Sequence, residues 1–556
     1  MSSLFQMFAE LGQRQRYVLL TLLFLASVIA LSPGIGEVTG VTAKDEYFVY
    51  LRTALSMIEQ DAWIVPILDG APFVKKPPMI SWLTRASFEV FGVSLTSARM
   101  VSVLFAALFV LVVALIGFEF TENLRYSLCA GLIALSTAGV AIQSKYLLFD
   151  VPTATFGGFG FYWFLKWCKR DGITFLVGVT ICLSGGFLTK GPIVFVVFGS
   201  GVLALLIVNR EVRSVVLRRN RALIGSLLLF LGLTVPWFLY VYMLYPDYSV
   251  AMIQHDIAAR QFGNFTLIPL IGPAIIAFPW TFLLIHLLIQ PNALPTNLLE
   301  VEGRRTMLIL WLGLSILPFL FIKTFIRYLI GSIIPIALLC AAMIESNAQR
   351  PIKIHARVGM IVTSFVVLLF AGFCWWFKTP TGGLAAVLVG YAVFTMIWWQ
   401  GTRLFLMALS ATVLWMMLLG FLYPSLGVNE IPPRIFKEVE GRPVILYRGP
   451  QPGLLPITMG RSLKQRLVLT TDDVSNKGGP SPLIFAPEED AKALERELRT
   501  LGVGYERVDS YKTLSSRVWW IRFAREGATW KDWIHAMRSR TLEPIKRTIV
   551  LYAILD

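Results

Sequence analysis

Two adjacent carboxylates, Asp45 and Glu46, stand in the stretch VTAKDEYFVYL, between an apolar run and an aromatic one. Active sites use such side chains to orient or deprotonate a hydroxyl group. Acidic residues also favour the first turn of a helix, because they compensate the positive end of the helix dipole. The pair is therefore either a solvated helix start or part of an active site at a membrane surface, and the sequence does not decide which carboxylate would act.

A third carboxylate, Asp150, stands at the mouth of an apolar segment in KYLLFDVPTATF, with Lys145 and Tyr146 nearby. Because Pro152 follows, Asp150 could simply cap a helix. The alternative is a second catalytic carboxylate.

Basic residues interrupt the apolar sequence at three further places. These are Lys75 and Lys76 before a double proline, Lys190 in FLTKGP, and Lys323 and Arg327 in KTFIR. Contacts to lipid headgroups or snorkelling of the long side chains would explain such charges. Binding of a phosphate group explains them as well. FLTKGP is not a P-loop, since the spacing of that motif is absent.

The stretch QHDIAARQFGN offers little for a metal ion. His255, Asp256 and Arg260 fit one helical neighbourhood, and the last two can form an ion pair at i, i+4. The chain has only four histidines, and its five cysteines include no C-x-x-C pair. The sequence therefore supports neither a divalent metal nor another cofactor.

The composition places these residues in a membrane protein. Of the 556 residues, 56% are hydrophobic and only 15% are charged, and a soluble protein of this size could not bury so much apolar surface. The net charge of +16 invites a nucleic-acid partner. However, the basic residues cluster in short loops between apolar segments, where a cytoplasmic bias explains them better.

A bilayer core of about 30 Å needs about 20 apolar residues per helix. Thirteen segments approach that length: 16–35, 98–118, 127–144, 152–168, 173–189, 192–208, 222–243, 269–290, 306–322, 328–344, 358–377, 384–400 and 403–423. The first is interpreted as a retained helix and not a signal peptide, because it lacks a convincing cleavage site and many spans follow.

The basic loops fix the expected orientation. They are Arg14–Arg16, Lys166–Arg170, Arg210–Arg221, Arg304–Arg305 and Arg350–Arg357. Counting spans puts all five on one side, which is cytoplasmic by the positive-inside rule, as is the N-terminus. The carboxylates and the other cations then converge on the opposite aqueous face. Lys323 and Arg327 are hardest to explain by headgroup contacts there.

Two domains are predicted. Residues 1–423 form the transmembrane domain, and within it residues 36–97 form a first outer segment with interfacial helices and Trp63 as an anchor. Residues 424–556 alternate strand-like and helical patterns, including RPVILYRG, PLIFAPEEDAKALERELRTLG and SRVWWIRFA. They predict a small α/β domain outside the membrane.

The order of the motifs DE, KPP, LFD, FLTKGP, DIAARQF and FIKTFIRYLIGSIIP resembles a known family. It is similar to the bacterial membrane glycosyltransferases of the C-type fold. The nearest branch contains the lipid A aminoarabinose transferases, and the protein O-mannosyltransferases are more distant. FLTKGP and the K-x3-RY-x5-P element are the most specific motifs, and the resemblance covers most of the chain.

The resemblance implies inverting transfer of a sugar from a polyprenyl (undecaprenyl) phosphate carrier, without a nucleotide donor, at the periplasmic face of the bacterial inner membrane. The acceptor would be lipid A or another envelope glycolipid or glycan. Asp45 or Glu46 would be the first catalytic carboxylate and Asp150 the second. The residues implied to hold the donor phosphate are Lys76, Lys190, Lys323 and Arg327. The supporting residues are Tyr50, Lys75, Tyr146, His255, Asp256, Arg260 and Tyr328.

The sequence departs from the family pattern in its first loop. The family's DE-x-RY becomes DE-YFVY, and the spacing to KPP is one residue longer. Alignment without a gap places Glu46 on the usual aspartate and Tyr50 on the usual tyrosine. Lys75 replaces the glutamate that the aminoarabinose transferases have there, and their histidine aligns poorly with His255, which argues against a metal site. The sugar, the acceptor and the oligomeric state are not predicted.

Three other functions are alternatives to this one. A protein O-glycosyltransferase would share the fold. A transporter or flippase of lipid-linked sugars would place ionisable residues near the bilayer midplane, on broken helices, whereas the charges here lie at the ends of spans. A membrane scaffold would leave Lys323 and Arg327 unexplained.

Overall fold

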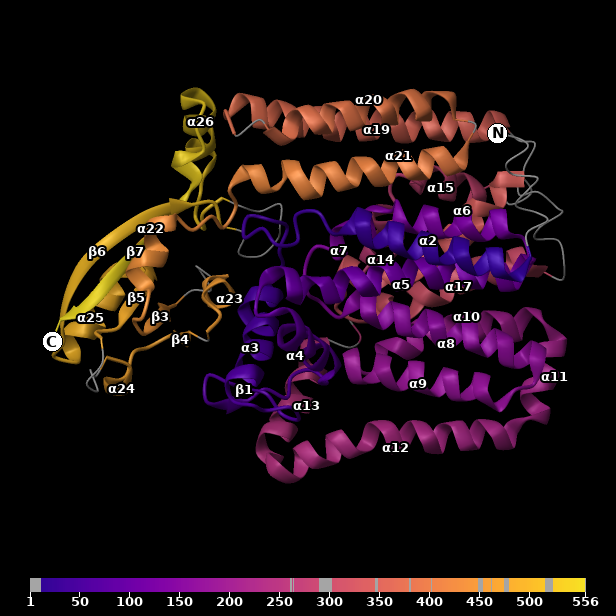
Figure 1. Ribbon diagram of the computed structural model, residues 1–556, viewed down its shortest axis with the longest axis horizontal. Helices are drawn as coiled ribbons and strands as arrows, with labels where there is room; N and C mark the ends of the chain where they lie inside the picture. The colour runs from indigo at the N-terminus through magenta and orange to yellow at the C-terminus, as the bar shows by residue number, and fades with distance from the viewer. Residues whose placement is uncertain are drawn as a thin grey trace.

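The computed structural model describes residues 12–555 apart from 261–262, 264, 290–302, 346–348, 380–381, 402, 449–453, 462, 475–479 and 516–523. Long helices run side by side along the longest axis of the molecule, and a sheet with its own helices stands beyond one end of them (Figure 1). This arrangement puts the helical bundle and the C-terminal sheet in two distinct parts of the molecule.

The bundle consists of helices on all thirteen predicted spans. They are α2 (Gln13–Leu31), α5 (Leu95–Thr121), α6 (Leu124–Leu135), α7 (Ala138–Gln143), α8 (Asp150–Arg170), α9 (Ile173–Lys190), α10 (Ile193–Val208), α12 (Asn220–Leu244), α14 (Ile268–Ile276), α15 (Thr281–Ile289), α17 (Arg304–Ile316), α18 (Ile333–Ala341), α19 (Gln349–Trp376), α20 (Gly382–Gln400) and α21 (Leu404–Met417). Among the described residues, eight helices are long and apolar enough to cross a membrane. A multi-pass membrane protein is therefore confirmed, while thirteen crossings stay a prediction.

Side-chain burial shows which helices face lipid. Helix α5 buries most of its residues, whereas α12 buries only Thr234, Trp237 and Val241 and exposes Leu228 and Met243. An apolar helix with exposed apolar side chains needs a hydrocarbon environment. Helix α5 is thus a central element and α12 lies at the border of the bundle, as Figure 1 also shows.

Several predicted spans are interrupted. The segment 127–144 breaks between α6 and α7, where the hydroxyl of Thr137 accepts a hydrogen bond from the Val140 N–H. The segment 269–290 breaks between α14 and α15 near Pro279, which has no N–H for a helical hydrogen bond. Hydropathy alone did not predict these breaks, because the few polar residues there, such as Ser136 and Thr137, lie within otherwise apolar sequence.

The first outer segment contains a π-helix, η1 (Glu46–Tyr50), α3 (Leu51–Glu59), a short hairpin of β1 (Ile67–Leu68) and β2 (Ala71–Pro72), and α4 (Met79–Phe91). Helix α3 was predicted to lie at the membrane interface. Instead it is buried in protein: seven of its nine residues are buried, in a cluster that includes Leu454 and Ile457. Its amphipathic pattern therefore reflects packing under the C-terminal residues, whereas α4 leaves Phe91 exposed at its end.

The C-terminal residues form a five-stranded sheet in the order β4-β3-β5-β7-β6. The strands are β3 (Val444–Tyr447), β4 (Lys464–Arg466), β5 (Leu483–Pro487), β6 (Gly504–Thr513) and β7 (Arg547–Leu555). Strand β3 pairs in parallel with β4 and β5, and β7 is antiparallel to β5 and β6. The helices are α22 (Pro433–Val439), α23 (Leu455–Met459), α24 (Thr471–Val474), α25 (Ala491–Thr500) and α26 (Trp530–Ser539). Apolar clusters cover both faces of the sheet. Most of the predicted strand SRVWWIRFA lies outside the described residues.

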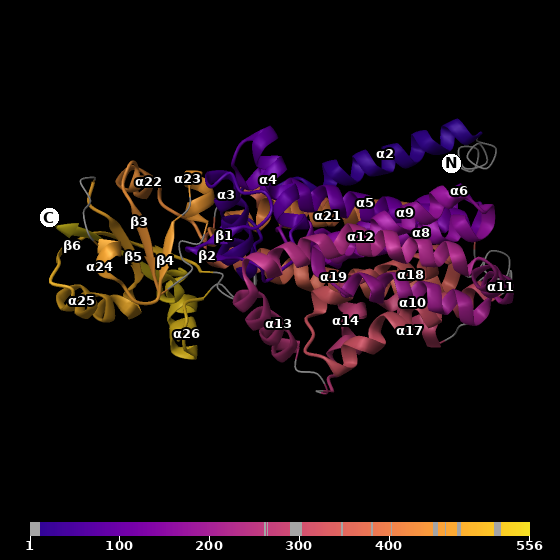
Figure 2. The same ribbon diagram turned by 90° about the horizontal axis from the view of Figure 1, so that it is seen from below.

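The sheet is tied to the first outer segment by Arg52. This buried side chain of α3 contacts Asp69 at 2.5 Å and donates a hydrogen bond to the carbonyl oxygen of Leu463 at 3.2 Å. Figure 2 shows α3 and the hairpin of β1 and β2 between the bundle and the sheet. The outer segment therefore connects the two parts of the protein.

We expect acid to weaken the structure around Asp473. Burial raises the pKa of this carboxyl, but hydrogen bonds from Arg466 and Thr470 outweigh burial and hold the pKa below its ordinary value of 3.8. Because the folded-state pKa is the lower one, the stabilisation is complete above pH 3.8 and is lost as the pH falls through the lowered value. Hydrogen–deuterium exchange of the full chain, corrected for the intrinsic exchange rate at each pH, should show lower protection around α24 at acid pH.

The variant Asp473→Asn is the control for this prediction. It removes hydrogen bonds to a charged group, which costs about 1.5–3 kcal/mol, and it should abolish the acid dependence at α24. If the parent and Asp473→Asn lose protection together as the pH falls, another group carries the effect.

Candidate active site

Asp150 and Lys190 are brought together by a helical hairpin. Helix α8 begins at Asp150, α9 ends at Lys190, and only Asp171 and Gly172 connect the two helices. The first residue of α8 therefore lies beside the last residue of α9, and Lys190 Nζ forms an ion pair with Asp150 Oδ1. Each charge also has the favourable sign for its own helix end.

Arg327 joins this pair to the first outer segment. It lies in the 3₁₀ helix η5 (Ile326–Ser332). Its Nε is 3.4 Å from Asp150 Oδ2, and its Nη2 donates to Asp45 Oδ2 at 3.2 Å. Four predicted site residues, Asp45, Asp150, Lys190 and Arg327, thus form one cluster with a formal charge of zero, which we call the charge cluster.

The exposure of the charge cluster increases in one direction. The side chains of Asp150 and Lys190 are 4% and 6% exposed, whereas those of Arg327 and Asp45 are 26% and 44% exposed. A ligand from the outside would therefore meet Asp45 and Arg327 first.

Aromatic rings surround the charge cluster. Lys190 Nζ lies 3.6 Å from the centroid of the Tyr328 ring, a cation–π contact. Tyr50 packs edge-on against Phe149 with ring centroids 4.3 Å apart. Burial raises the pKa of Tyr50, and the negative charge of Asp45 raises it further, so this phenol stays protonated. Tyr146 is buried in the loop before α8.

Glu46 lies in a different environment from its neighbour Asp45. It is fully buried and accepts hydrogen bonds from Arg99 Nε and Nη2 at 2.8 and 3.0 Å, from the Thr42 hydroxyl at 2.5 Å, and from the Leu147 N–H at 2.9 Å. These contacts fix the loop before Asp150 against the first outer segment. Sequence reasoning missed Arg99, although a charge inside the predicted span 98–118 signals a buried partner.

The other predicted site residues are not members of the charge cluster, and the side chains of some of them lie outside the described part of the chain. Lys75 and Lys323 are exposed, and Lys76 is half-buried just before α4. His255, Asp256 and Arg260 lie on α13 (Pro246–Arg260), but their side chains are outside the description. Among the described residues, no group of three His, Cys, Asp or Glu side chains could hold a metal ion.

Comparison with solved structures identifies the fold class as that of the C-type membrane glycosyltransferases. The chain is similar to ArnT from Cupriavidus metallidurans in complex with undecaprenyl phosphate, with a TM-score of 0.68 and 16% identity over 97% of this chain and 98% of that one. The apo structure of the same enzyme matches equally well. The predicted C-type fold is confirmed.

Sequence comparisons indicate the same branch. The family model for dolichyl-phosphate-mannose-protein mannosyltransferase matches residues 10–252. The chain is 24% identical over 334 residues to the undecaprenyl phosphate-alpha-4-amino-4-deoxy-L-arabinose arabinosyl transferase of Pseudomonas savastanoi, and 26% identical over 333 residues to one from Pseudomonas fluorescens. These matches span 56% of this chain and 60% and 57% of those relatives. The chain is therefore similar to the aminoarabinose transferases that its motifs resemble, and the sequence matches span less than two thirds of those relatives.

Proposed function

We propose that the protein is an inverting glycosyltransferase that moves a sugar from a polyprenyl phosphate carrier, such as undecaprenyl phosphate, to lipid A or another envelope glycolipid. The charge cluster is the observation that carries this proposal. It places two carboxylates and two cations at helix ends on one face of a membrane protein. The names of the relatives and the carrier bound to the similar ArnT structure support the same chemistry.

In the proposed step, an oxygen of the acceptor attacks the anomeric carbon of the sugar. The new C–O bond forms as the bond between this carbon and the carrier phosphate breaks, and the electron pair leaves with the phosphate. Lys190 and Arg327 stabilise the charge that develops on that phosphate. Asp45 accepts the proton if the acceptor is a hydroxyl, and it only positions an acceptor that is already an ionised phosphate.

Asp150 has a positioning role in this scheme. Its two oxygens face Lys190 and Arg327, so it holds both cations before a ligand arrives. Preorganised charges lower a barrier because they need no rearrangement during the reaction. When phosphate binds, Arg327 exchanges its contact with Asp45 for phosphate oxygens, which leaves Asp45 available to the acceptor. Lys76 and Lys323 are proposed as further phosphate ligands.

We further propose that the charge cluster and the C-terminal sheet face the periplasm of a bacterial inner membrane and that the N-terminus is cytoplasmic. Helix α11 (Arg210–Arg218) carries one of the basic loops and lies at the end of the bundle away from the sheet (Figure 1). Basic loops favour the cytoplasmic side, which leaves the other end outside.

The match to the protein mannosyltransferase family model supports a second candidate acceptor, a protein hydroxyl. In that case Asp45 would act as the general base, because an alcohol must lose its proton. The donor and the charge cluster would have the same roles as in transfer to a lipid acceptor.

Mass spectrometry of lipid A, glycans and envelope proteins from cells with and without the chain tests the proposal. We expect a sugar-sized mass increment in the lipid fraction that depends on the chain and is lost in Asp45→Asn. The variant Asp171→Asn is a matched control, since Asp171 lies at the other end of α8, is 70% exposed and has the left-handed backbone that asparagine tolerates.

Three results would contradict the lipid acceptor or the reaction itself. A sugar found only on proteins would establish the second candidate. Movement of labelled carrier across the membrane without a covalent product would identify a transporter. Full transfer by Asp45→Asn would remove this carboxylate from the mechanism.

A further inference from the structure

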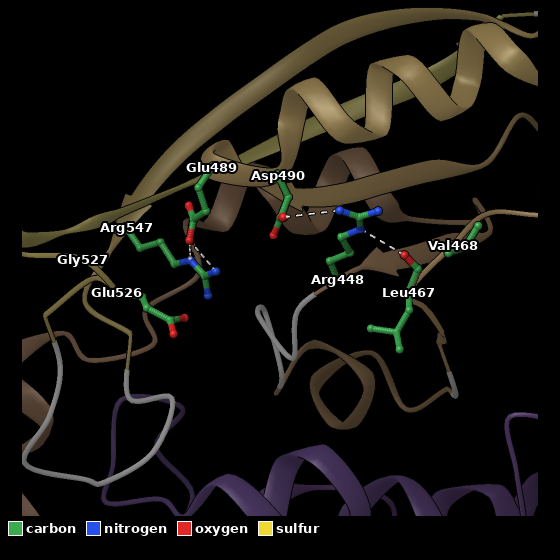
Figure 3. Close-up of a pocket in the computed structure, with 8 residues that line it drawn as sticks. All are labelled: Arg448, Leu467, Val468, Glu489, Asp490, Glu526, Gly527 and Arg547. Carbon is green, nitrogen blue, oxygen red and sulfur yellow. Dashed lines mark hydrogen bonds and ion pairs between the residues drawn. The ribbon is translucent and has the colours of Figure 1, made fainter.

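A pocket of about 670 Å³ lies in the C-terminal sheet domain, apart from the charge cluster. Its lining includes Arg448, Leu467, Glu489, Asp490, Glu526 and Arg547. Figure 3 shows Arg547 and Glu526 on one side of the pocket and Arg448 and Asp490 on the other, with side chains that point into the space between them.

The topology of the sheet creates this pocket. Arg448 directly follows β3, Leu467 directly follows β4, and Glu489 and Asp490 follow β5 within three residues. These three strands are parallel, so their carboxyl ends meet at one edge. Strand β4 lies on one side of β3 and β5 on the other, so the order reverses at β3. Open α/β sheets bind ligands in the crevice at such a reversal.

Arg547 gives the pocket an unused hydrogen-bond donor. It begins β7, its side chain is 2% exposed, and its Nε and Nη2 contact Glu489 at 2.8 and 2.6 Å. Its Nη1 is buried and has no hydrogen-bond partner within the part of the chain that the structure describes. A buried donor without a partner costs free energy, and a ligand oxygen would recover it once a shift of the Arg547 side chain opens Nη1 to the pocket.

The opposite wall offers both donors and acceptors. Arg448 donates to Glu497 at 2.8 Å and to the Leu467 carbonyl oxygen at 3.1 Å, and its Nη1 is 4.0 Å from Asp490. Asp490 is 27% exposed and Glu489 47% exposed, so both carboxylates are accessible to a ligand. With Glu526, the pocket has three carboxylates and two guanidinium groups.

We propose that this pocket binds a short saccharide. Sugar hydroxyls both donate and accept hydrogen bonds, so they match carboxylates and guanidinium groups at the same time. A phosphate would face three carboxylates, and an apolar ligand would leave the charges unpaired. Leu467 is 77% exposed beside the pocket and offers an apolar contact for the C–H face of a sugar ring. A volume of about 670 Å³ holds a ligand of this size.

Ligand binding to the purified full chain in nanodiscs tests this site. The probes are disaccharides of glucose, mannose, galactose, glucosamine and N-acetylglucosamine. Their binding is measured by saturation-transfer NMR and calorimetry, and inorganic phosphate is tested in the same way as the alternative class of ligand. We expect at least one disaccharide to bind, and Asp490→Asn to weaken that binding about tenfold. The formal excess of one negative charge predicts tighter binding of the glucosamine form than of its N-acetyl form.

The variants separate binding from folding. Arg547→Gln should abolish binding, but it also breaks the buried pair with Glu489, so the more exposed Asp490→Asn provides the independent test. Arg434→Gln is the control, because Arg434 pairs with Asp509 at 2.9 Å elsewhere in the same domain. Binding of phosphate alone, no binding of any disaccharide, or equal binding by Asp490→Asn would overturn the proposal. The readout is binding and not sugar transfer, so it does not depend on the proposed reaction.

Discussion

Replacing Arg327 with glutamine is expected to lower the rate of sugar transfer about 100- to 1,000-fold, the usual effect of removing one donor that stabilises developing charge. Arg327 is the more accessible of the two cations in the charge cluster, since it is 26% exposed whereas Lys190 is 6% exposed. It contacts both Asp45 and Asp150, so it also bridges the two carboxylates and offsets their mutual repulsion. Its loss should reduce kcat more than substrate binding.

The measurement is transfer of labelled sugar from a polyprenyl phosphate donor to extracted envelope lipids by purified protein. Arg327→Lys should retain part of the activity, because lysine keeps the charge but loses the planar fork that can hold two oxygens. Arg219→Gln is a matched control: Arg219 is also 26% exposed and pairs with Asp171 at 3.0 Å, at the opposite end of α8. A rate within about threefold of the parent for Arg327→Gln would exclude Arg327 from charge stabilisation.

The site residues that could be predicted from the sequence are those that lie at the ends of apolar spans, because hydropathy locates these ends. Asp150 and Lys190 each terminate an apolar segment, and a two-residue connection forces those ends together. Arg327 was identifiable because a cation between two apolar spans, on the face that the basic loops predict to be outside, runs against the positive-inside tendency. A charged residue at the end of a helix is therefore a strong indication of a site residue when hydropathy locates the helix clearly.

Long-range pairing could not be predicted in the same way. Glu46 and Arg99 are 53 residues apart, and no local pattern shows that they meet in the interior. The amphipathic helix α3 was assigned to the membrane interface because hydropathy does not distinguish a lipid surface from a protein surface. The buried contacts with Leu454 and Ile457, about 400 residues later in the chain, decide its environment.

The adjacent carboxylates Asp45 and Glu46 should respond to substitution in opposite ways. Glu46→Gln is expected to lower the free energy of unfolding by about 3–5 kcal/mol, because it leaves the buried guanidinium of Arg99 without its counter-charge. Asp45→Asn should change stability by less than about 1 kcal/mol, since its pair with Arg327 is partly exposed. The same Asp45→Asn variant should lower transfer to a hydroxyl acceptor about 10²- to 10⁴-fold, the range for loss of a general base.

Two measurements test this comparison. One is the unfolding of both variants in detergent, monitored by intrinsic fluorescence, and the other is the transfer assay. The double variant Glu46→Gln/Arg99→Met is the control for the mechanism, because removing the second charge should recover part of the stability lost in Glu46→Gln alone. A Glu46→Gln protein that is as stable as the parent but inactive, beside an active Asp45→Asn, would reverse the roles. Glu46 would then be the acting carboxylate, and its contacts with Arg99, Thr42 and Leu147 would have to break before the acceptor could reach it.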